Sequence, residues 1–189
     1  MNKGLLVVYA GASGVGKGTI MKKLLAANPN IRLSVSATTR QPREGEVNGR
    51  EYYFVTREEF ERMIAENGFL EYAEYVGNCY GTPKQPVFDM LDQGIDVFLE
   101  IEIKGFLQIK ESCPDCVSIF IIPPSYEELR ARLTGRGTES EEVIAARLKT
   151  AEEELSYQDR FDYVVINDDA DRAANEVLSI ITDIKSKKE

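Results

Sequence analysis

Apolar and polar residues alternate along this chain with two different periods, and these predict strands and helices in turn. Short continuous apolar runs at 5–9, 97–99 and 117–122 are typical of strands buried on both faces of a sheet. Longer stretches carry apolar residues three and four positions apart, as expected of helices with one buried face. The alternation of the two kinds of segment predicts an α/β fold with a parallel sheet core flanked by helices.

Turn and capping signals set the approximate limits of the other elements. The first helix is predicted over about 17–27, with Ile20, Leu24 and Leu25 facing inward. Further strands are expected near 32–36, 52–55, 70–76 and 163–166. Further helices are expected at 56–67, 83–94, 105–111 and 125–135, in a segment capped at Thr138, and at the end of the chain. The segment after Thr138 has its apolar stripe at Ile144, Leu148, Ala151 and Leu155, and the closing helix at Ala173, Val177, Ile180 and Ile184.

Composition narrows the possible functions. The chain has 189 residues, 43% apolar and 29% charged, which is enough for one globular unit with a buried core. Its formal charge of −9 disfavours non-specific nucleic-acid binding, which depends on neutralising phosphates. The apolar runs are far shorter than the ~20 residues of a membrane helix. A cytoplasmic protein is therefore expected, with neither nucleic acid nor membrane as a partner, and the oligomeric state is left open.

Three cysteines and no histidine limit the available chemistry. Cys113 and Cys116 have the spacing of a redox or zinc pair. However, the sequence offers no second pair and no histidine to complete a tetrahedral zinc site, so coincidence is favoured over a reactive pair. Without histidine the commonest general base is missing, which favours chemistry based on positioning and electrostatics, such as phosphoryl transfer.

The strongest motif lies directly after the first apolar run. Residues 11–19 read Gly-Ala-Ser-Gly-Val-Gly-Lys-Gly-Thr, a glycine-rich turn that opens the first helix. Such a turn directs backbone N–H groups at phosphate, and Lys17 would reach the β- and γ-phosphates. Gly18 stands where a serine or threonine is usual, so the hydroxyl of Thr19 is displaced by one residue. The motif predicts a nucleoside triphosphate site; an ordinary glycine-rich turn is the alternative.

The predicted parallel core is interrupted twice. The core comprises about 1–35, 86–124 and 159–189, a mixed α/β insertion spans about 36–85, and a charged helical segment spans about 125–158. Ligands of open α/β sheets bind at the carboxyl ends of the strands, from which both interruptions are expected to leave. The arrangement predicts two mobile flaps over a triphosphate site and hence two substrates.

The first interruption contains a candidate second phosphate site. Arg40 and Arg43 flank a turn stiffened by Pro42, and Tyr52 and Tyr80 offer phenolic donors. Guanidinium groups match phosphate oxygens bidentately. A solvated loop with surface arginines is the alternative for this segment alone, but the phosphate loop favours a second phosphate site.

Six motifs in register carry a resemblance that covers almost the whole chain. They are Gly-Ala-Ser-Gly-Val-Gly-Lys-Gly-Thr, Ser-Ala-Thr-Thr-Arg-Gln-Pro-Arg-x-Gly-Glu, Asn-Gly-Arg-Glu-Tyr-Tyr-Phe, Gly-Asn-Cys-Tyr-Gly-Thr, Gly-Arg-Gly-Thr-Glu and Ile-Asn-Asp-Asp. In this order they resemble the guanylate kinases, nucleoside monophosphate kinases with a P-loop NTPase-type fold. The resemblance implies transfer of the γ-phosphoryl of MgATP to GMP, a GMP-binding domain at 36–85 and a lid at 125–158.

The resemblance also implies roles for individual residues. Those implied for GMP are Ser36, Arg40, Arg43, Tyr52, Glu71, Tyr80, Thr82, Glu100 and Glu102. Those implied for ATP are Gly11, Ala12, Ser13, Gly14, Val15, Gly16, Lys17, Gly18, Thr19, Arg136, Asn167 and Asp168. Lys17, Arg40, Arg136 and Arg147 are the implied catalytic residues, with Arg132 a weaker candidate. Thr19 and Glu100 would hold Mg²⁺, with water as an intermediary at Glu100.

Glu71 is the residue expected to select the base. Guanine presents N1–H and its 2-amino group as neighbouring donors, and one carboxylate can accept both. Adenine would leave that carboxylate unpaired, which costs ~1–3 kcal/mol or more.

Two positions depart from the residues that are more common in the family. This chain has Glu102 where the family more often has Asp, and Lys104 where it more often has Gln. Two other functions stay open: a non-catalytic guanylate-kinase-like module that binds phosphopeptides, and a kinase for another nucleoside monophosphate.

Overall fold

The computed structural model describes residues 3–135 and 140–187, in which helices and strands alternate along the chain. The strands are β1 (Leu6–Gly11), β2 (Ile31–Leu33), β3 (Ala37–Thr38), β4 (Tyr53–Phe54), β5 (Phe69–Tyr75), β6 (Asn78–Pro83), β7 (Asp96–Glu100), β8 (Val117–Ile122) and β9 (Tyr163–Ile166). The helices are α1 (Lys17–Ala27), α2 (Arg57–Ala65), α3 (Lys84–Asp92), α4 (Ile103–Ser112), α5 (Tyr126–Thr134), α6 (Glu141–Leu155), the short 3₁₀ turn η1 (Gln158–Arg160) and α7 (Ala170–Ser186).

The strands form two sheets. Five have the order β2-β7-β1-β8-β9, and four have the order β4-β3-β6-β5. Strands β1, β7 and β8 are buried over most of their length, and β8 pairs in parallel with β9. Continuous burial is typical of parallel strands covered on both faces, so the predicted α/β class is confirmed. The chain divides into two compact units, each of which is described by itself below.

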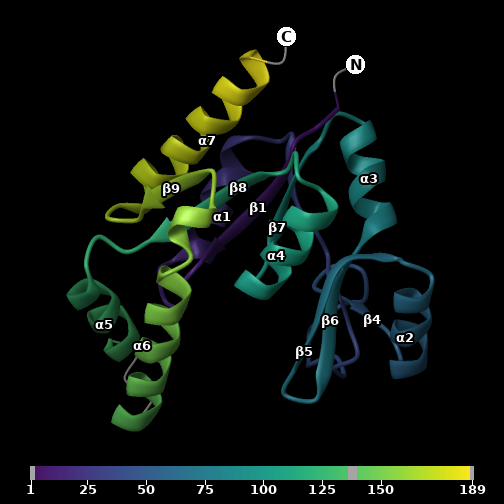
Figure 1. The fold of residues 1–189 in the computed structure, drawn as a ribbon, viewed down its shortest axis with the longest axis horizontal. Coiled ribbons are helices and arrows are strands. Elements are labelled where there is room, and N and C mark those ends of the chain that lie inside the picture. Colours follow the sequence, from purple (N-terminus) through teal and green to yellow (C-terminus); the bar gives the residue numbers. More distant parts are fainter. Residues whose placement is uncertain (1–2, 136–139, 188–189) are drawn as a thin grey trace. The chain divides into compact units, whose positions relative to one another are not determined.

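The first unit comprises Met1–Val8 and Arg32–Cys116 and is dominated by the hairpin of β5 and β6. Val76 and Gly77 have φ angles of 48° and 74° and form the two-residue turn between these strands. Phe60 of α2 packs in a buried cluster with Phe69 and Cys79. Helix α2 therefore lies against the four-stranded sheet, as Figure 1 shows. This packing fixes the sheet that carries the acidic and hydroxyl side chains discussed below.

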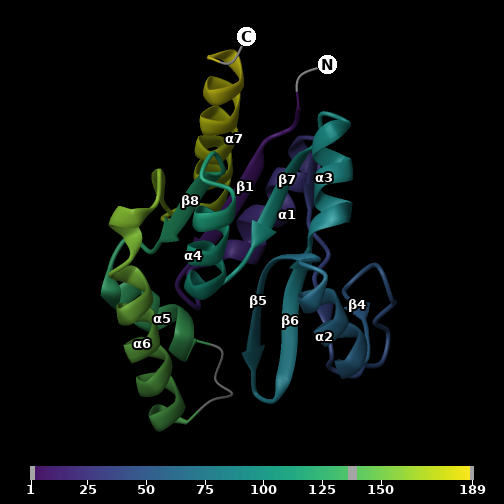
Figure 2. The same cartoon turned by 45° about the vertical axis from the view of Figure 1, so that its right-hand side comes forward.

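The second unit comprises Tyr9–Ile31 and Val117–Glu189. Helix α7 packs along α1, and α5 lies beside α6 (Figure 2). Ser125 and Ser140 cap α5 and α6, since each hydroxyl accepts an N–H of the first turn. The glycine-rich turn between β1 and α1 belongs to this unit. No helix among the described residues is both long and apolar enough to cross a bilayer.

Several limits predicted from the sequence are confirmed. Helix α1 and strands β8 and β9 have the predicted bounds, and Thr56 and Glu59 form the predicted capping box of α2. The three cysteines are free thiols, with Cys79 and Cys116 buried. In the described ranges, no group of three or more His, Cys, Asp or Glu side chains is arranged to hold a metal ion.

One strand prediction was wrong in its bounds, and one strand was not predicted. The strand expected at 32–36 ends at Leu33, because the chain then leaves the five-stranded sheet and enters the four-stranded one at Ala37. No strand was predicted at 78–83, and a helix was expected to begin at Pro83, yet these residues form β6. Glycine and asparagine signal a loop locally, but pairing with β5 supplies the hydrogen bonds of a strand.

Three helix predictions also needed correction. Leu25 was expected to face inward but is 37% exposed, because one helical step turns it away from buried Leu24. On α7, Ile181 is buried in place of Ile180 and Ile184, following the spacing of four from Val177. The N-cap of α6 is Ser140. Thr138, the predicted cap, lies outside the described residues.

Candidate functional site

The glycine-rich turn of the second unit depends on two glycines with left-handed backbone. Gly14 and Gly16 have φ angles of 86° and 93°. A Cβ at Gly16 would lie 2.5 Å from Nδ2 of Asn167, and one at Gly14 would lie 2.7 Å from Leu133. A larger residue at either position would therefore be strained by the left-handed backbone and would displace the neighbouring side chain. The N-terminus of α1 follows this turn, and the first N–H groups of an α-helix are the ones available to an anion, so the geometry agrees with the predicted phosphate site.

Lys17, the first residue of α1, folds back over the turn. Its Nζ donates to the carbonyl oxygens of Gly11 at 2.6 Å and of Ala12 at 3.1 Å. The hydroxyl of Tyr9 donates to the Lys17 carbonyl at 3.2 Å. These contacts keep the ammonium group over the concave side of the turn. Gly18 and Thr19 follow as exposed residues of the first helical turn.

Asn167, at the end of β9, ties a second loop to the turn. It is 5% exposed, and its Nδ2 donates to the Val15 carbonyl at 2.6 Å. Arg132 of α5 donates to the carbonyls of Val15 at 3.3 Å and Asn167 at 2.9 Å. It also pairs with Glu128 at 2.9 Å. Arg132 thus binds main-chain oxygens and a carboxylate, and this network stabilises the shape of the turn.

Helix α6 contacts the turn through Ser13. The backbone N–H of Ser13 donates to the Glu154 carboxylate at 3.1 Å, and Nη2 of Arg147 donates to the Ser13 hydroxyl at 3.0 Å. A carboxylate oxygen thus accepts an N–H of the kind that such turns offer to phosphate. We call this set, residues 11–19 with Arg132, Arg147, Glu154 and Asn167, the phosphate-loop site.

The remaining predicted residues of the second unit lie apart from these contacts or outside the described part. Asp168 accepts from Arg172 at 2.6 Å, which lowers the pKa of its carboxyl group. Asp169 caps α7 by accepting the N–H groups of Asp171 and Arg172. Arg136 lies outside the described residues.

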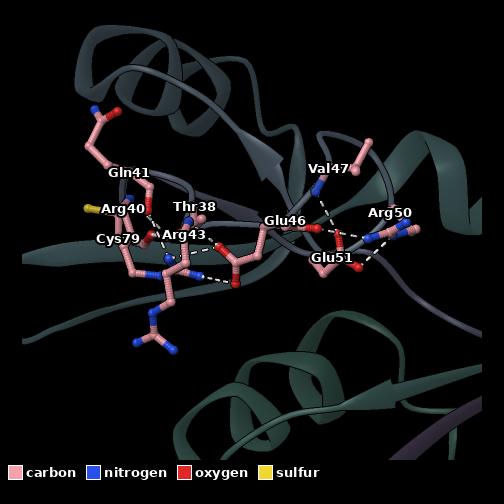
Figure 3. Close-up of polar contacts among 10 residues, drawn as sticks. Thr38, Arg40, Gln41, Arg43, Glu46, Val47, Arg50, Glu51 and Cys79 are labelled. Atoms are coloured by element: carbon pink, nitrogen blue, oxygen red, sulfur yellow. Dashed lines mark hydrogen bonds and ion pairs between the residues drawn. The ribbon is translucent and has the colours of Figure 1, made fainter.

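The first unit holds a second set of charged groups, shown in Figure 3. Nη1 and Nη2 of Arg40 donate to the two carboxylate oxygens of Glu46 at 3.0 and 2.9 Å. The backbone N–H of Arg43 donates to Glu46 at 2.7 Å, and Nη1 of Arg40 also donates to the Gln41 carbonyl at 2.8 Å. The Arg40 guanidinium and the Arg43 N–H hold the pKa of the Glu46 carboxyl group below its usual value. The carboxylate therefore stays ionised at neutral pH.

Aromatic rings surround the Arg40 guanidinium. Its Cζ lies 5.4 Å from the ring centroid of Tyr52 and 5.8 Å from that of Phe54. The rings of Tyr52 and Tyr80 meet edge to face, with centroids 6.1 Å apart. Glu46 raises the pKa of Arg40, and Tyr80 adds to the effect. The structure therefore brings three of the four predicted phosphate ligands together, while the side chain of Arg43 is exposed.

Glu71 and Thr82 face each other across the hairpin of β5 and β6. The Thr82 hydroxyl donates to Oε1 of Glu71 at 2.6 Å, and the two residues are 0% and 8% exposed. Burial raises the pKa of the Glu71 carboxyl group, although the bond from Thr82 opposes this. A Cβ at Gly105 would lie 2.7 Å from Oε2 of Glu71, so a larger residue at this position of α4 would displace the carboxylate.

The other predicted residues of the first unit are near the ends of strands. Ser36 lies before β3, and its carbonyl accepts the N–H of Tyr53 at 2.9 Å. Glu100 is the exposed last residue of β7, and Glu102 is the exposed N-cap of α4. The negative charge of Glu102 contributes to the raised pKa of Glu71. We call Ser36, Arg40, Arg43, Glu46, Tyr52, Phe54, Glu71, Tyr80, Thr82, Glu100 and Glu102 the hairpin site.

Sequence reasoning did not assign a role to three of the residues that shape these sites. Glu46 and Glu154 both bind groups expected to contact phosphate, and Gly105 makes room for Glu71. For Glu46 a signal existed, because it follows Arg40 and Arg43 at intervals of three within one motif. The contact of Glu154 with Ser13 joins residues 141 positions apart, for which the sequence has no local signal.

Comparisons of the sequence and of the structure with known proteins both match guanylate kinases. The guanylate kinase family model matches residues 3–184. A guanylate kinase of Lactococcus lactis is 56% identical over 179 residues, covering 95% of this chain and 87% of its own length. One of Caldanaerobacter subterraneus is 55% identical over the same span and coverage. The crystal structure of guanylate kinase from Anaplasma phagocytophilum matches at a TM-score of 0.75 and 38% identity, covering 96% of this chain and 86% of that chain.

Proposed function

The chain belongs to the guanylate kinase family, and we propose that it transfers the γ-phosphoryl group of ATP to GMP, giving ADP and GDP. Its fold is accordingly the P-loop NTPase-type α/β fold expected from the sequence. The observation that carries the choice of acceptor is the buried Glu71 carboxylate held by Thr82. A phosphopeptide-binding module has no need for a buried carboxylate that matches the N1–H and 2-amino donors of guanine.

In this proposal the phosphate-loop site binds ATP. The N–H groups of residues 11–19 surround the phosphates, and Lys17 moves from the carbonyls of Gly11 and Ala12 to the β- and γ-phosphates. Arg147 already donates to Ser13 of the turn, which supports its role at the triphosphate. Asn167 and Asp168 border the adenine. Arg136 belongs to this proposal on the strength of the sequence motif alone.

The hairpin site binds GMP in this proposal. Arg40, Arg43, Tyr52 and Tyr80 contact the acceptor phosphate, while Ser36, Glu71, Thr82 and Glu102 recognise guanine. The geometry of Glu71 supports base selection, because the bond from Thr82 fixes the orientation of the buried carboxylate, and each carboxylate oxygen can accept more than one hydrogen bond. A buried carboxylate left unpaired by adenine would cost several kcal/mol, since the group is charged.

The residues available for a metal fit Mg²⁺ held through substrate and water. Thr19 and Glu100 each present one exposed oxygen-bearing side chain. Mg²⁺ typically uses one or two protein oxygens together with phosphates and waters, which matches so sparse a donor set. When bound, the ion would offset negative charge on the phosphates. The chain's own contribution is to orient the phosphates and supply cations from Lys17, Arg40 and Arg147.

No general base is required in this mechanism. The sequence contains no histidine, and the acceptor is a phosphate oxygen that is already ionised at neutral pH. Positioning and charge neutralisation therefore carry the rate, and the helical segment 125–158 is proposed as a lid that excludes water. The GMP-binding insertion at 36–85, the core boundaries and a cytoplasmic location stay predictions.

The test is a coupled assay of ADP release with a panel of acceptors. We expect turnover with GMP to exceed that with AMP, UMP, CMP or dTMP by at least about a hundredfold. Comparable rates with another nucleotide would assign the chain to a different monophosphate kinase activity. Absence of turnover with every acceptor, together with binding of a phosphoserine peptide that GMP displaces, would support the binding module.

A further inference from the structure

Glu46 contacts both of the arginine positions in the hairpin site. Its two oxygens accept from Nη1 and Nη2 of Arg40, and one of them also accepts the backbone N–H of Arg43 (Figure 3). The side chains of Arg40 and Glu46 are only 16% and 18% exposed. A pair this well shielded and bidentate has a better-defined geometry than an ordinary surface ion pair.

The hydrogen bonds of Arg40 show which of its donors remain for a ligand. A guanidinium group has five N–H donors in a rigid fork. Glu46 takes one from each Nη atom, and the Gln41 carbonyl takes the second from Nη1. The other two, Nε–H and the second Nη2–H, are parallel and lie on one edge of the group, and the guanidinium also has a side-chain hydrogen bond with Tyr80, itself a predicted phosphate ligand. Such an edge matches two oxygens of one phosphate.

The aromatic rings restrict the other movements of the guanidinium. Tyr52 and Phe54 both lie within 6 Å of its Cζ, so they limit tilting of the guanidinium plane. They do not stop rotation within that plane. Glu46 supplies the missing constraint, because its two parallel bonds fix the end of the fork.

We propose that Glu46 is a positioning residue that holds the end of the Arg40 fork and so presents the Nε–Nη2 edge to the acceptor phosphate. Its bond to the Arg43 N–H sets the turn from which the second arginine extends. The inference rests on the proposed function, since it takes the ligand of Arg40 to be the phosphate of GMP. Glu46 itself need not touch GMP.

The same loop offers a matched control. Glu51 accepts the backbone N–H of Val47 at 2.7 Å and pairs with Nε of Arg50 at 2.6 Å, so it combines a backbone bond and an arginine bond as Glu46 does. Arg50 is 63% exposed and shares none of the Arg40 contacts (Figure 3). Replacing Glu51 therefore tests loop folding without changing the orientation of Arg40.

The experiment compares GMP with guanosine, which lacks the phosphate, in calorimetric binding to the whole protein. We expect Glu46→Gln to weaken GMP binding about tenfold and to leave guanosine binding within about twofold. Glu51→Gln should change neither. Equal losses for the two ligands would show a purely structural role and overturn the inference. Tighter GMP binding by Glu46→Gln would also overturn it, because Glu46 would then be a competitor of the phosphate.

An Arg40→Ala variant distinguishes the proposed role of Glu46 from the proposed binding of the GMP phosphate by Arg40. One outcome is that Arg40→Ala abolishes the higher affinity for GMP than for guanosine while Glu46→Gln retains it. That outcome would refute the role of Glu46 and leave the role of Arg40 intact. If both variants retain the higher affinity for GMP, both assignments fail. In the Arg40→Ala background, Glu46→Gln should have a smaller effect on GMP affinity than in the parent protein, because only its bond to the Arg43 N–H is then altered. An undiminished loss would show that Glu46 does not act through Arg40.

Discussion

The two sites of this protein differ in whether backbone or side-chain groups form them. The phosphate-loop site is mainly backbone: a turn with glycines at φ 86° and 93°, opening the helix that begins at Lys17. The hairpin site is mainly side chain, with Arg40, Glu46 and Glu71 contributed by a loop and a strand. A backbone site suits the triphosphate chain common to all nucleoside triphosphates, while a side-chain site can distinguish one base from another.

Carboxylates occupy opposite roles in the two sites. In the hairpin site, Glu46 binds the Nη1–Nη2 end of Arg40 and does not take the donors of its Nε–Nη2 edge. In the phosphate-loop site, Glu154 accepts the Ser13 N–H, a donor that a phosphate would itself use. The comparison teaches that a carboxylate near a phosphate site either orients the cation or competes with the ligand, depending on which donor it takes.

The largest effect is expected from Lys17→Ala in the phosphate-loop site. Loss of the only ammonium group that contacts the turn in the described structure should lower kcat at least about a hundredfold. The midpoint of thermal unfolding should change little. Lys23→Ala is the control, because Lys23 of the same helix pairs with Asp171 on the surface. Wild-type kcat in the Lys17 variant would refute the assignment of the turn.

Glu71→Gln tests the hairpin site and should raise the KM for GMP about tenfold to a hundredfold, with a small change for ATP. Equal changes in the two KM values would show that Glu71 does not recognise the base. Glu74→Gln is the control on the same strand, since Glu74 is exposed and pairs with Arg57.

The same substitution should stabilise the protein in the absence of nucleotide. Because burial raises the pKa of Glu71 in the folded state, folding favours the protonated form. The contribution of Glu71 to the free energy of unfolding is therefore greatest below the pKa that this group has in the unfolded chain. It falls as the pH rises through the higher pKa of the folded state. At neutral pH, Glu71→Gln should raise the free energy of unfolding, and the gain should disappear as the pH falls below the unfolded pKa. Chemical denaturation at several pH values measures this, and a loss at neutral pH would contradict it.

Asn167→Ala should have an intermediate effect confined to the phosphate-loop site. It removes the buried bond to the Val15 carbonyl and should lower the free energy of unfolding by about 1–3 kcal/mol. The KM for ATP should rise severalfold, while that for GMP stays constant. Asn175→Ala, on the exposed face of α7, is the control. An equal rise in both KM values would show that Asn167 does not act through the turn alone.

The smallest effect, and one of opposite sign, is expected from Glu154→Gln. Removing the carboxylate from the Ser13 N–H should tighten binding of ADP by a fewfold, because less competition remains. Fluorescence titration with a labelled ADP would measure the change, with Glu153→Gln as the exposed neighbouring control. Weaker ADP binding would show that Glu154 positions the turn, as Glu46 is proposed to position Arg40.

The sequence determined those parts of the protein that depend on neighbouring residues. Three kinds of local feature could be predicted. They are the bounds of α1, β8 and β9, the capping box at Thr56, and the glycine-rich turn before α1. Helix capping, helical periodicity and left-handed glycines act over a few residues, so the physical causes are themselves local. The resemblance then supplied the roles of distant residues, which no local rule provides.

Tertiary structure alone decided which distant groups meet. Pairing with β5 made a strand of residues 78–83 and placed Thr82 against Glu71, and packing of α6 placed Glu154 on Ser13. The fold also places Gly105 beside Glu71, where a Cβ would displace the carboxylate. Such contacts depend on how elements pack across 11 to 141 positions of sequence, and packing is a property of the whole fold.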